Sequence, residues 1–219
     1  DGRVHLMERI EDTGVFELFI PGLAAGCGYM YEIKRQGKGT TRKLDPVSRQ
    51  ISSVPIIASV VSDENMPDSY AWNDGLWMIK RKKEAGKKKP VTVYEVSLTD
   101  WLKEKSADEL VDFVKQEGYT HVCFLPVAEY LNEEMNGYST LGYFAVTHRI
   151  GGSDAFKKLV DDCHNAGIGV IIDWNGAYFG TEAKGLYDFD GADAYGYLKP
   201  SLEKHPEWDV VTFDYKKGA

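Results

Sequence analysis

The segment from residue 91 to residue 174 alternates β-branched runs with amphipathic runs, and this alternation limits the possible folds most strongly. Residues 91–96, 120–125 and 169–174 have the composition of strands, whereas the two stretches between them place apolar residues at helical spacing. Gly118 and Gly167 end the helical stretches just before the next strand. This order predicts a parallel α/β sheet covered by helices. The third run is so apolar that we expect it to be buried on both faces.

Serine residues mark the expected starts of both helices. Ser106 is followed three residues later by Glu109, the spacing of a capping box, and Leu110 begins the apolar face. Ser153 has the corresponding place before the second helix, whose apolar positions include Phe156. The sequence therefore predicts helices that begin after Ser106 and after Ser153.

The first part of the chain has a different pattern, in which short β-rich runs alternate with glycine and proline. Residues 15–20 lead into Pro21 and Gly22, and residues 29–34 follow two further glycines. Such punctuation is typical of antiparallel strands, and we expect residues 1–61 to be part of a β-sandwich.

The stretch between these two patterns is polar and carries most of the basic residues that stand close together. We expect residues 62–89 to be a linker, and the lysine-rich runs 80–83 and 87–89 to form a solvated loop, because blocks of like charge are usually exposed. A second domain is then expected over residues 90–219.

Composition excludes several classes of function. The 219 residues carry 26 Lys plus Arg against 34 Asp plus Glu, a net charge of −8, and no sustained basic stripe, so a nucleic-acid surface is not expected. No run of about 18 apolar residues exists, so a membrane-spanning helix is not expected. Cys27, Cys123 and Cys163 have no disulfide or zinc spacing, which favours a reducing compartment, the cytoplasm. Because Asp1 is not Met, we expect the chain to be cut at its ends.

Polar and aromatic side chains follow the expected strand ends, where a (β/α) sheet places its chemistry. The candidate residues are Glu129, Tyr138, Arg149, Asp173 and Tyr178. Carboxylates mixed with aromatic rings suit a sugar, whose apolar face stacks on a ring while its hydroxyls bond to polar groups. Alternatives stay open, since Asp173 could brace a loop, Glu129 could serve only structural hydrogen bonds, and Tyr138 could be a packed loop residue.

Other chemistries have less support. His148 is a further site candidate, whereas we expect His121 and His164 to be structural. We find no Ser-His-Asp set, no phosphate-binding glycine loop and no cluster with metal-ligand spacing in the sequence. We therefore expect no metal and no cofactor.

Six stretches carry a recognisable pattern: residues 14–22 (GVFELFIPG), 93–96 (VYEV), 118–129 (GYTHVCFLPVAE), 137–149 (GYSTLGYFAVTHR), 160–174 (VDDCHNAGIGVIIDW) and 205–208 (HPEW). In this order they resemble stretches of bacterial 1,4-α-glucan branching enzymes, members of the α-amylase superfamily. The resemblance covers nearly the whole chain. It implies a glycan-binding-type β-sandwich followed by the first three strands of a (β/α)8 TIM barrel.

The resemblance also implies a reaction. An Asp nucleophile and a Glu acid would cut an α-1,4 bond with retention, and the glucan segment would pass to a 6-hydroxyl of another chain, which is the branching step of glycogen synthesis. In the family these carboxylates come from later barrel strands, so no catalytic residue is expected within residues 1–219. The implied partner is an α-1,4-glucan. We expect the segment alone to be inactive and prone to aggregation, and the sequence predicts no oligomeric state.

The candidate pocket both follows the family pattern and departs from it. Tyr138 matches the tyrosine that stacks on the sugar next to the cleaved bond, and Asp173 matches the aspartate that ends the third strand. Four positions differ from the pattern: Tyr178 and Ser97 replace histidines, Asn136 replaces tryptophan and Ser139 replaces glutamine. The alternative is therefore a glucan-binding paralogue without catalysis. A hydrolase or a trehalose-forming relative is a third, weaker alternative.

Overall fold

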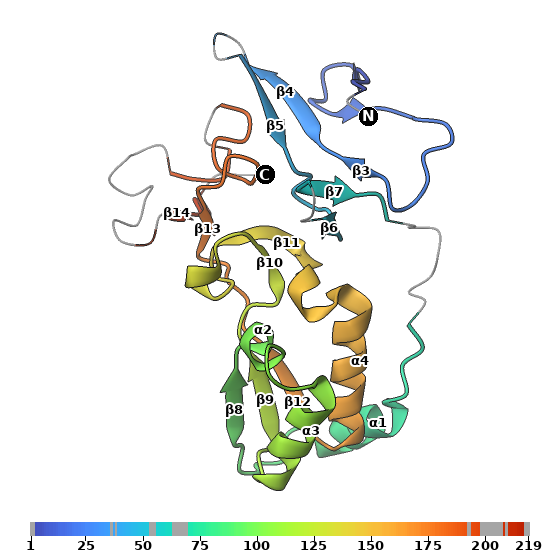
Figure 1. Cartoon of the computed structure of the whole chain (residues 1–219), viewed down its shortest axis with the longest axis vertical. Coiled ribbons are helices and arrows are strands. Elements are labelled where there is room, and N and C mark those ends of the chain that lie inside the picture. Colours follow the sequence, from blue (N-terminus) through green and yellow to red (C-terminus); the bar gives the residue numbers. More distant parts are fainter. Residues whose placement is uncertain are drawn as a thin grey trace.

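A computed structural model shows two regions that follow one another along the long axis of the molecule (Figure 1). It describes residues 3–35, 37, 39–52, 56–62, 70–191, 194–197, 208 and 210–216. One region holds a three-stranded sheet with the main helices, and the other holds short antiparallel pairs; a β-hairpin lies between them. The expected residues 205–207 of the HPEW stretch lie outside the described residues.

The sheet confirms the parallel α/β prediction. Strands β8 (Val93–Val96), β9 (His121–Phe124) and β12 (Gly169–Ile172) pair in parallel in the order β12-β9-β8. Helices α3 (Ala107–Gln116) and α4 (Gly152–Asn165) join these strands, and a short helix α2 (Leu98–Trp101) follows β8. The main core lies between one sheet face and the two long helices; its most buried members are Leu110, Val114, Val122, Phe124 and Cys163.

The two long helices begin in different ways. In α3 the capping box is confirmed: Glu109 N donates to Ser106 Oγ at 3.2 Å, and Ser106 N donates to Glu109 Oε2 at 2.7 Å. The expected cap at Ser153 is wrong, because α4 begins at Gly152 and its N-cap is Gly151, with φ of 87° and no side-chain cap bond. A β-carbon at Gly151 would lie 2.8 Å from that of Ala155, so only glycine fits this tight entry.

The prediction that the third strand is buried on both faces is wrong. Ile171 and Ile172 of β12 are 40% and 46% exposed. Within the described residues β12 pairs with β9 alone, so it is an edge strand. Ile171 shares a row with Cys123 and Glu95 on the sheet face that α3 and α4 do not cover. An apolar strand needs a second neighbour and a second covering layer to be buried.

The expected solvated loop at residues 80–83 is also wrong, because these residues belong to helix α1 (Gly75–Glu84). Lys, Arg, Leu and Met are good helix formers, and the basic residues of its last turn suit the negative end of the helix dipole. The helix is held on α4: Trp77 stacks on His164 with centroids 3.7 Å apart, and His164 Nδ1 lies 2.7 Å from Asp74 Oδ2. Residues 63–69 lie outside the described part.

The long connection between β9 and α4 contains regular secondary structure. It contains the antiparallel hairpin β10 (Ala128–Tyr130) and β11 (Thr140–Val146), with register shifts on either side of Glu129. The short 3-10 helices η1 (Glu133–Met135) and η2 (His148–Ile150) flank β11. After β12 the chain forms a second antiparallel pair, β13 (Tyr178–Gly180) with β14 (Val210–Thr212).

The N-terminal region confirms antiparallel pairing, although its strands are short. Its strands are β1 (Glu8–Arg9), β2 (Phe16–Glu17), β3 (Gly28–Tyr29), β4 (Tyr31–Arg35), β5 (Gly39–Lys43), β6 (Ile51–Ser52) and β7 (Ala58–Val60). They form the sheet β3-β7-β6 and the pairs β4-β5 and β1-β2. The expected strand over residues 15–20 is thus only two residues long.

Two basic side chains fix this region to the segment after β13. Lys43 is 2% exposed, and its Nζ donates to the carbonyl oxygens of Ala183 at 2.6 Å and Tyr187 at 2.5 Å. Arg35 Nη1 pairs with Asp188 Oδ2 at 2.5 Å. No helix among the described residues has both the length and the apolar composition of a bilayer span.

Candidate functional site

Tyr138 and Asp173 meet at the carboxyl end of β12. Asp173 follows the strand directly, and its backbone N–H donates to the Phe124 carbonyl at 2.8 Å, which continues the sheet by one residue. Tyr138 lies in the loop between η1 and β11, and its hydroxyl donates to Asp173 Oδ2. Burial raises the pKa of Tyr138, and the hydrogen bond and the charge of Asp173 raise it further. The phenol therefore stays neutral and remains a hydrogen-bond donor at physiological pH.

Tyr178 lies near the same carboxylate. It is the first residue of β13, and its pKa is raised by partial burial and then by the negative charge of Asp173. Its ring tilts against Trp208 with centroids 5.9 Å apart. The exposed carboxylate of Glu95, on β8, also raises the pKa of Tyr138. The structure thus brings Tyr138, Asp173 and Tyr178 together although 35 residues separate the first pair.

Asn175 connects the backbones of this group, a role that the sequence analysis missed. Its side chain is 8% exposed and donates to the carbonyl oxygens of Tyr138 at 2.6 Å and Tyr178 at 2.9 Å. The sequence shows only an asparagine two residues after Asp173, and its burial and its partners come from tertiary structure.

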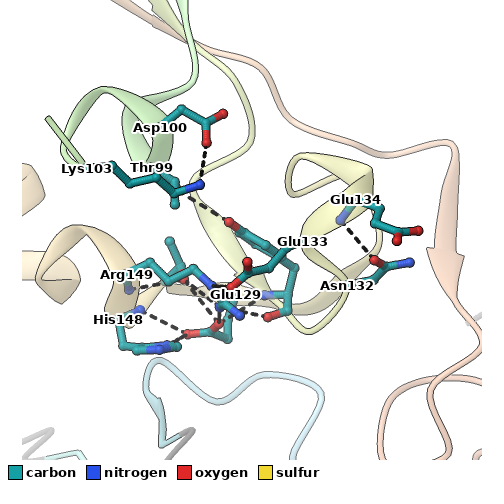
Figure 2. A network of polar contacts seen from close by, with 11 residues as sticks. Thr99, Asp100, Lys103, Glu129, Asn132, Glu133, Glu134, His148 and Arg149 are labelled. Carbon is teal, nitrogen blue, oxygen red and sulfur yellow. Dashed lines mark hydrogen bonds and ion pairs between the residues drawn. The ribbon is translucent and has the colours of Figure 1, made fainter.

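Glu129 lies apart from Asp173, at the centre of a polar network (Figure 2). It is 2% exposed, and its two carboxylate oxygens accept bonds from side chains and backbone groups of the following residues. The donors are Tyr130 N (3.1 Å), Thr147 Oγ1 (3.1 Å), His148 N (3.0 Å) and Arg149 Nη1 (2.9 Å), and His148 Nδ1 lies 3.0 Å away. With its oxygens used in this way, the placement of Glu129 favours the alternative of purely structural hydrogen bonds over a sugar contact.

Arg149 belongs to the same network and ties β10 to η2. Its Nη1 also donates to the Tyr130 carbonyl at 3.0 Å, and its guanidinium lies 4.3 Å from the centre of the Tyr130 ring. Its Nε pairs with Glu133 at 3.4 Å, near the surface. Arg149 is only 17% exposed, and it therefore holds the hairpin that leads to the Tyr138 loop through its contacts with Glu129 and Tyr130 (Figure 2).

Each of the other three positions that depart from the family pattern has a structural role in this chain. Ser97 caps α2, since Asp100 N donates to its Oγ at 3.3 Å. Asn136 ends η1 with φ of 47°, a left-handed conformation that asparagine tolerates. Ser139 is buried and donates to Glu182 Oε1 at 2.8 Å. Each replacement is compatible with the fold around the site.

The chemistry of the group at β12 suits a neutral polyol. It offers one carboxylate acceptor, two phenols held neutral and aromatic faces, the groups that bind hydroxyls and stack on a sugar ring. Within the described residues no group of three or more His, Cys, Asp or Glu side chains could hold a metal ion.

Comparison with known proteins confirms the resemblance seen in the sequence. The chain is 40% identical over 225 residues to the 1,4-alpha-glucan branching enzyme GlgB of Nitrosococcus oceani, covering 98% of this chain and 30% of that protein. It is 40% identical over 228 residues to the GlgB of Methylococcus capsulatus, covering 100% of this chain and 30% of that protein. The chain thus spans about 30% of the length of these relatives.

A solved structure supports the fold. The crystal structure of an alpha-amylase-like protein from Salmonella typhimurium matches with a TM-score of 0.68 and 24% identity, over 94% of this chain and 32% of the other. At that identity the likeness concerns the fold alone, and it agrees with a barrel-related architecture. No protein-family model matches the chain.

Proposed function

We propose that this chain, which is homologous to the GlgB 1,4-alpha-glucan branching enzymes along its length, is part of such an enzyme. The parent protein would cut an α-1,4 bond, hold the glucan segment as a covalent ester and transfer it to a 6-hydroxyl, forming an α-1,6 branch. The chain's similarity to GlgB over 98% to 100% of its residues carries the proposal.

Within this function the described residues would hold the donor glucan. A sugar ring would stack on Tyr138, and its hydroxyls would bond to Asp173 and Tyr178, which offer an acceptor and a donor near each other. Glu129 and Arg149 would brace the hairpin that carries Tyr138. The nucleophile and the acid would come from barrel strands beyond residue 219, so residues 1–219 would bind and position without cutting.

The same proposal gives the finer architecture. Residues 1–61 would belong to a glycan-binding-type β-sandwich, 62–89 would connect it to the barrel, and 90–219 would supply the first three strands of a (β/α)8 barrel. The exposed Ile171 and Ile172 of β12 support this, because a fourth strand would cover that edge in a closed barrel. The cytoplasm would be the compartment.

Product analysis on linear amylose tests the function. The full-length protein is incubated with amylose, and α-1,6 linkages are counted by proton NMR and by the chains that a debranching enzyme releases. We expect new α-1,6 linkages with no net gain in reducing ends before debranching. A gain in reducing ends without α-1,6 linkages would instead indicate a hydrolase.

The replaced motif positions favour one alternative, a paralogue that binds glucan without catalysis. Ser97, Asn136 and Ser139 lie outside the strands, between β8 and β11, and Tyr178 begins β13. If the full-length protein binds amylose in a sedimentation assay but forms no α-1,6 linkages, the binding paralogue is the correct function.

A further inference from the structure

A single buried amide ties together the three chain segments that carry the proposed sugar contacts. Asn175 donates through Nδ2 to the Tyr138 and Tyr178 carbonyl oxygens, and its Oδ1 accepts from Ala177 N at 3.2 Å. Carbonyl oxygens only accept and a backbone N–H only donates, so these partners fix which amide atom is which. Both Nδ2 hydrogens and the Oδ1 are therefore in use.

The partners of this amide come from different elements. Tyr138 lies between η1 and β11, Asn175 follows β12, and Tyr178 begins β13. A second bond acts on the same point, since the Tyr143 hydroxyl of β11 donates to the Tyr178 carbonyl at 2.8 Å. Removing Asn175 would leave the Tyr138 carbonyl without this donor and the Tyr178 backbone with one donor fewer.

We propose that Asn175 is a positioning residue for glucan binding: it sets the placement of the Tyr138 and Tyr178 side chains near Asp173. This inference rests on the proposed function. Asn175 is 8% exposed and its polar atoms are saturated, so it acts through its neighbours and does not touch the sugar. Such placement matters because a shift of about 1 Å in a positioned group can lower the rate of an enzyme about 100-fold.

The first test measures geometry without a ligand. The full-length protein is labelled with 3-fluorotyrosine, and the ¹⁹F resonances of Tyr138 and Tyr178 are assigned with Tyr138→Phe and Tyr178→Phe. We expect both resonances to move in Asn175→Ala. The matched control is Asn165→Ala, which also removes an amide that donates to a carbonyl, that of Asp161 at 2.9 Å on α4. Resonances that stay in place in Asn175→Ala overturn the proposal.

The second test measures binding. The dissociation constant for maltoheptaose is expected to rise about tenfold in Asn175→Ala and to stay unchanged in Asn165→Ala. The double variant of Asn175→Ala with Tyr178→Phe is expected to lose less binding free energy than the sum of the two single losses, because part of the effect of Asn175 passes through Tyr178. The proposal is overturned if the two losses of binding free energy add in the double variant. It is also overturned if the dissociation constant of Asn175→Ala lies within twofold of that of wild type. Asn175→Ser, whose hydroxyl can donate to one carbonyl, serves if Asn175→Ala does not fold, and is expected to show the same effects more weakly.

The two tests separate this inference from the proposed function. If the wild-type protein does not bind maltoheptaose, the proposed function fails, and the role of Asn175 in glucan binding fails with it. The ¹⁹F result still decides whether Asn175 places the two tyrosines. If wild type binds and Asn175→Ala binds equally well, only the inference about Asn175 fails.

Discussion

The hydroxyl of Tyr138 donates a hydrogen bond to the carboxylate of Asp173 at the carboxyl end of β12. The bond joins the hairpin loop to the central sheet and leaves the carboxylate beside a second phenol, that of Tyr178. Charge and burial together hold both phenols neutral. The site therefore combines one charged acceptor with two neutral donors.

Replacing the acceptor tests its role. Asp173→Asn keeps the size of the side chain but removes its charge, so the bonds from Tyr138 and from a sugar hydroxyl weaken. Hydrogen bonds to charged groups contribute about 1.5–3 kcal/mol, so we expect maltoheptaose affinity to fall about 10- to 100-fold. Calorimetric titration measures this change, and Asp154→Asn, an exposed carboxylate of α4, is the control. Equal affinities for wild type and Asp173→Asn would exclude Asp173 as a sugar ligand.

Tyr178 makes the hydroxyl contact insensitive to pH. Its pKa is raised above the ordinary tyrosine value of 10.0, so the phenol is neutral at every pH below about 10, and deprotonation beside Asp173 would weaken binding only at higher pH. We expect wild-type affinity for maltoheptaose to be constant from pH 5.5 to pH 8.5.

The variant Tyr178→His restores the residue of the family pattern and provides the comparison. An imidazole with a pKa near 6.5 changes charge within this range, so the affinity of Tyr178→His should vary with pH around that value. Affinity is measured by titration at half-unit steps. A flat profile for the variant, or a sloping one for wild type, would show that residue 178 does not contact the sugar.

Glu129 is expected to matter for stability more than for binding. Glu129→Gln leaves Arg149 with its charge in a mostly buried position, and loss of one partner of a buried pair costs about 3–5 kcal/mol. Glu133→Gln is the matched control, because Glu133 pairs with the same arginine but is exposed, and such pairs contribute about 0–1 kcal/mol. Thermal denaturation should show a clear fall for Glu129→Gln and almost none for Glu133→Gln. Similar melting temperatures would contradict the bracing role.

Lys43 should make stability depend on pH. Burial lowers its pKa in the folded chain below the value of 10.5 for the free side chain. Between the two values the unfolded chain binds more protons, so the free energy of unfolding rises with pH through that window and is smaller below it. Lys43→Met should flatten this rise between pH 8 and pH 10.5, and the control Lys34→Met, on the exposed face of β4, should keep it.

At pH 7 the same variant reports on the contact between the two regions. Lys43→Met removes two hydrogen bonds from a charged, buried donor to the carbonyl oxygens of Ala183 and Tyr187, and hydrogen bonds to charged groups contribute about 1.5–3 kcal/mol each. We expect a lower melting temperature than for Lys34→Met. Equal melting temperatures would show that the contact of β5 with the segment after β13 does not stabilise the protein.

Features that depend only on residues close in the sequence can be predicted from its pattern, whereas features that depend on tertiary contacts cannot. The capping box at Ser106 and Glu109 depends on residues three positions apart, so the pattern predicts it directly. The start of α4 depends on the left-handed Gly151 that closes η2, and Ser153 therefore misled the prediction. The charge of the basic residues 80–83 favours a loop. Their helix propensity and the contact of Trp77 with His164 instead stabilise a helix.

The candidate site shows the same division. Asp173 and Tyr138 were identified from their place after strand-like and glycine-containing runs, and the structure brings them into contact. Apart from Tyr130, the partners of Glu129 lie 18 to 20 residues away, so its burial cannot be predicted from its neighbours in sequence. Asn175 bonds to carbonyl groups that only the folded chain brings near. Ile171 is exposed because burial depends on neighbours that sequence pattern alone does not supply.

The most direct measurement compares the 219-residue chain with the full-length protein in the amylose assay. The sugar contacts are proposed to lie within residues 1–219 and the cleaving carboxylates beyond them. We therefore expect new α-1,6 linkages with the full-length protein and none with the 219-residue chain at equal concentration. Branch formation by the 219-residue chain, or none by the full-length protein, would contradict the proposed function.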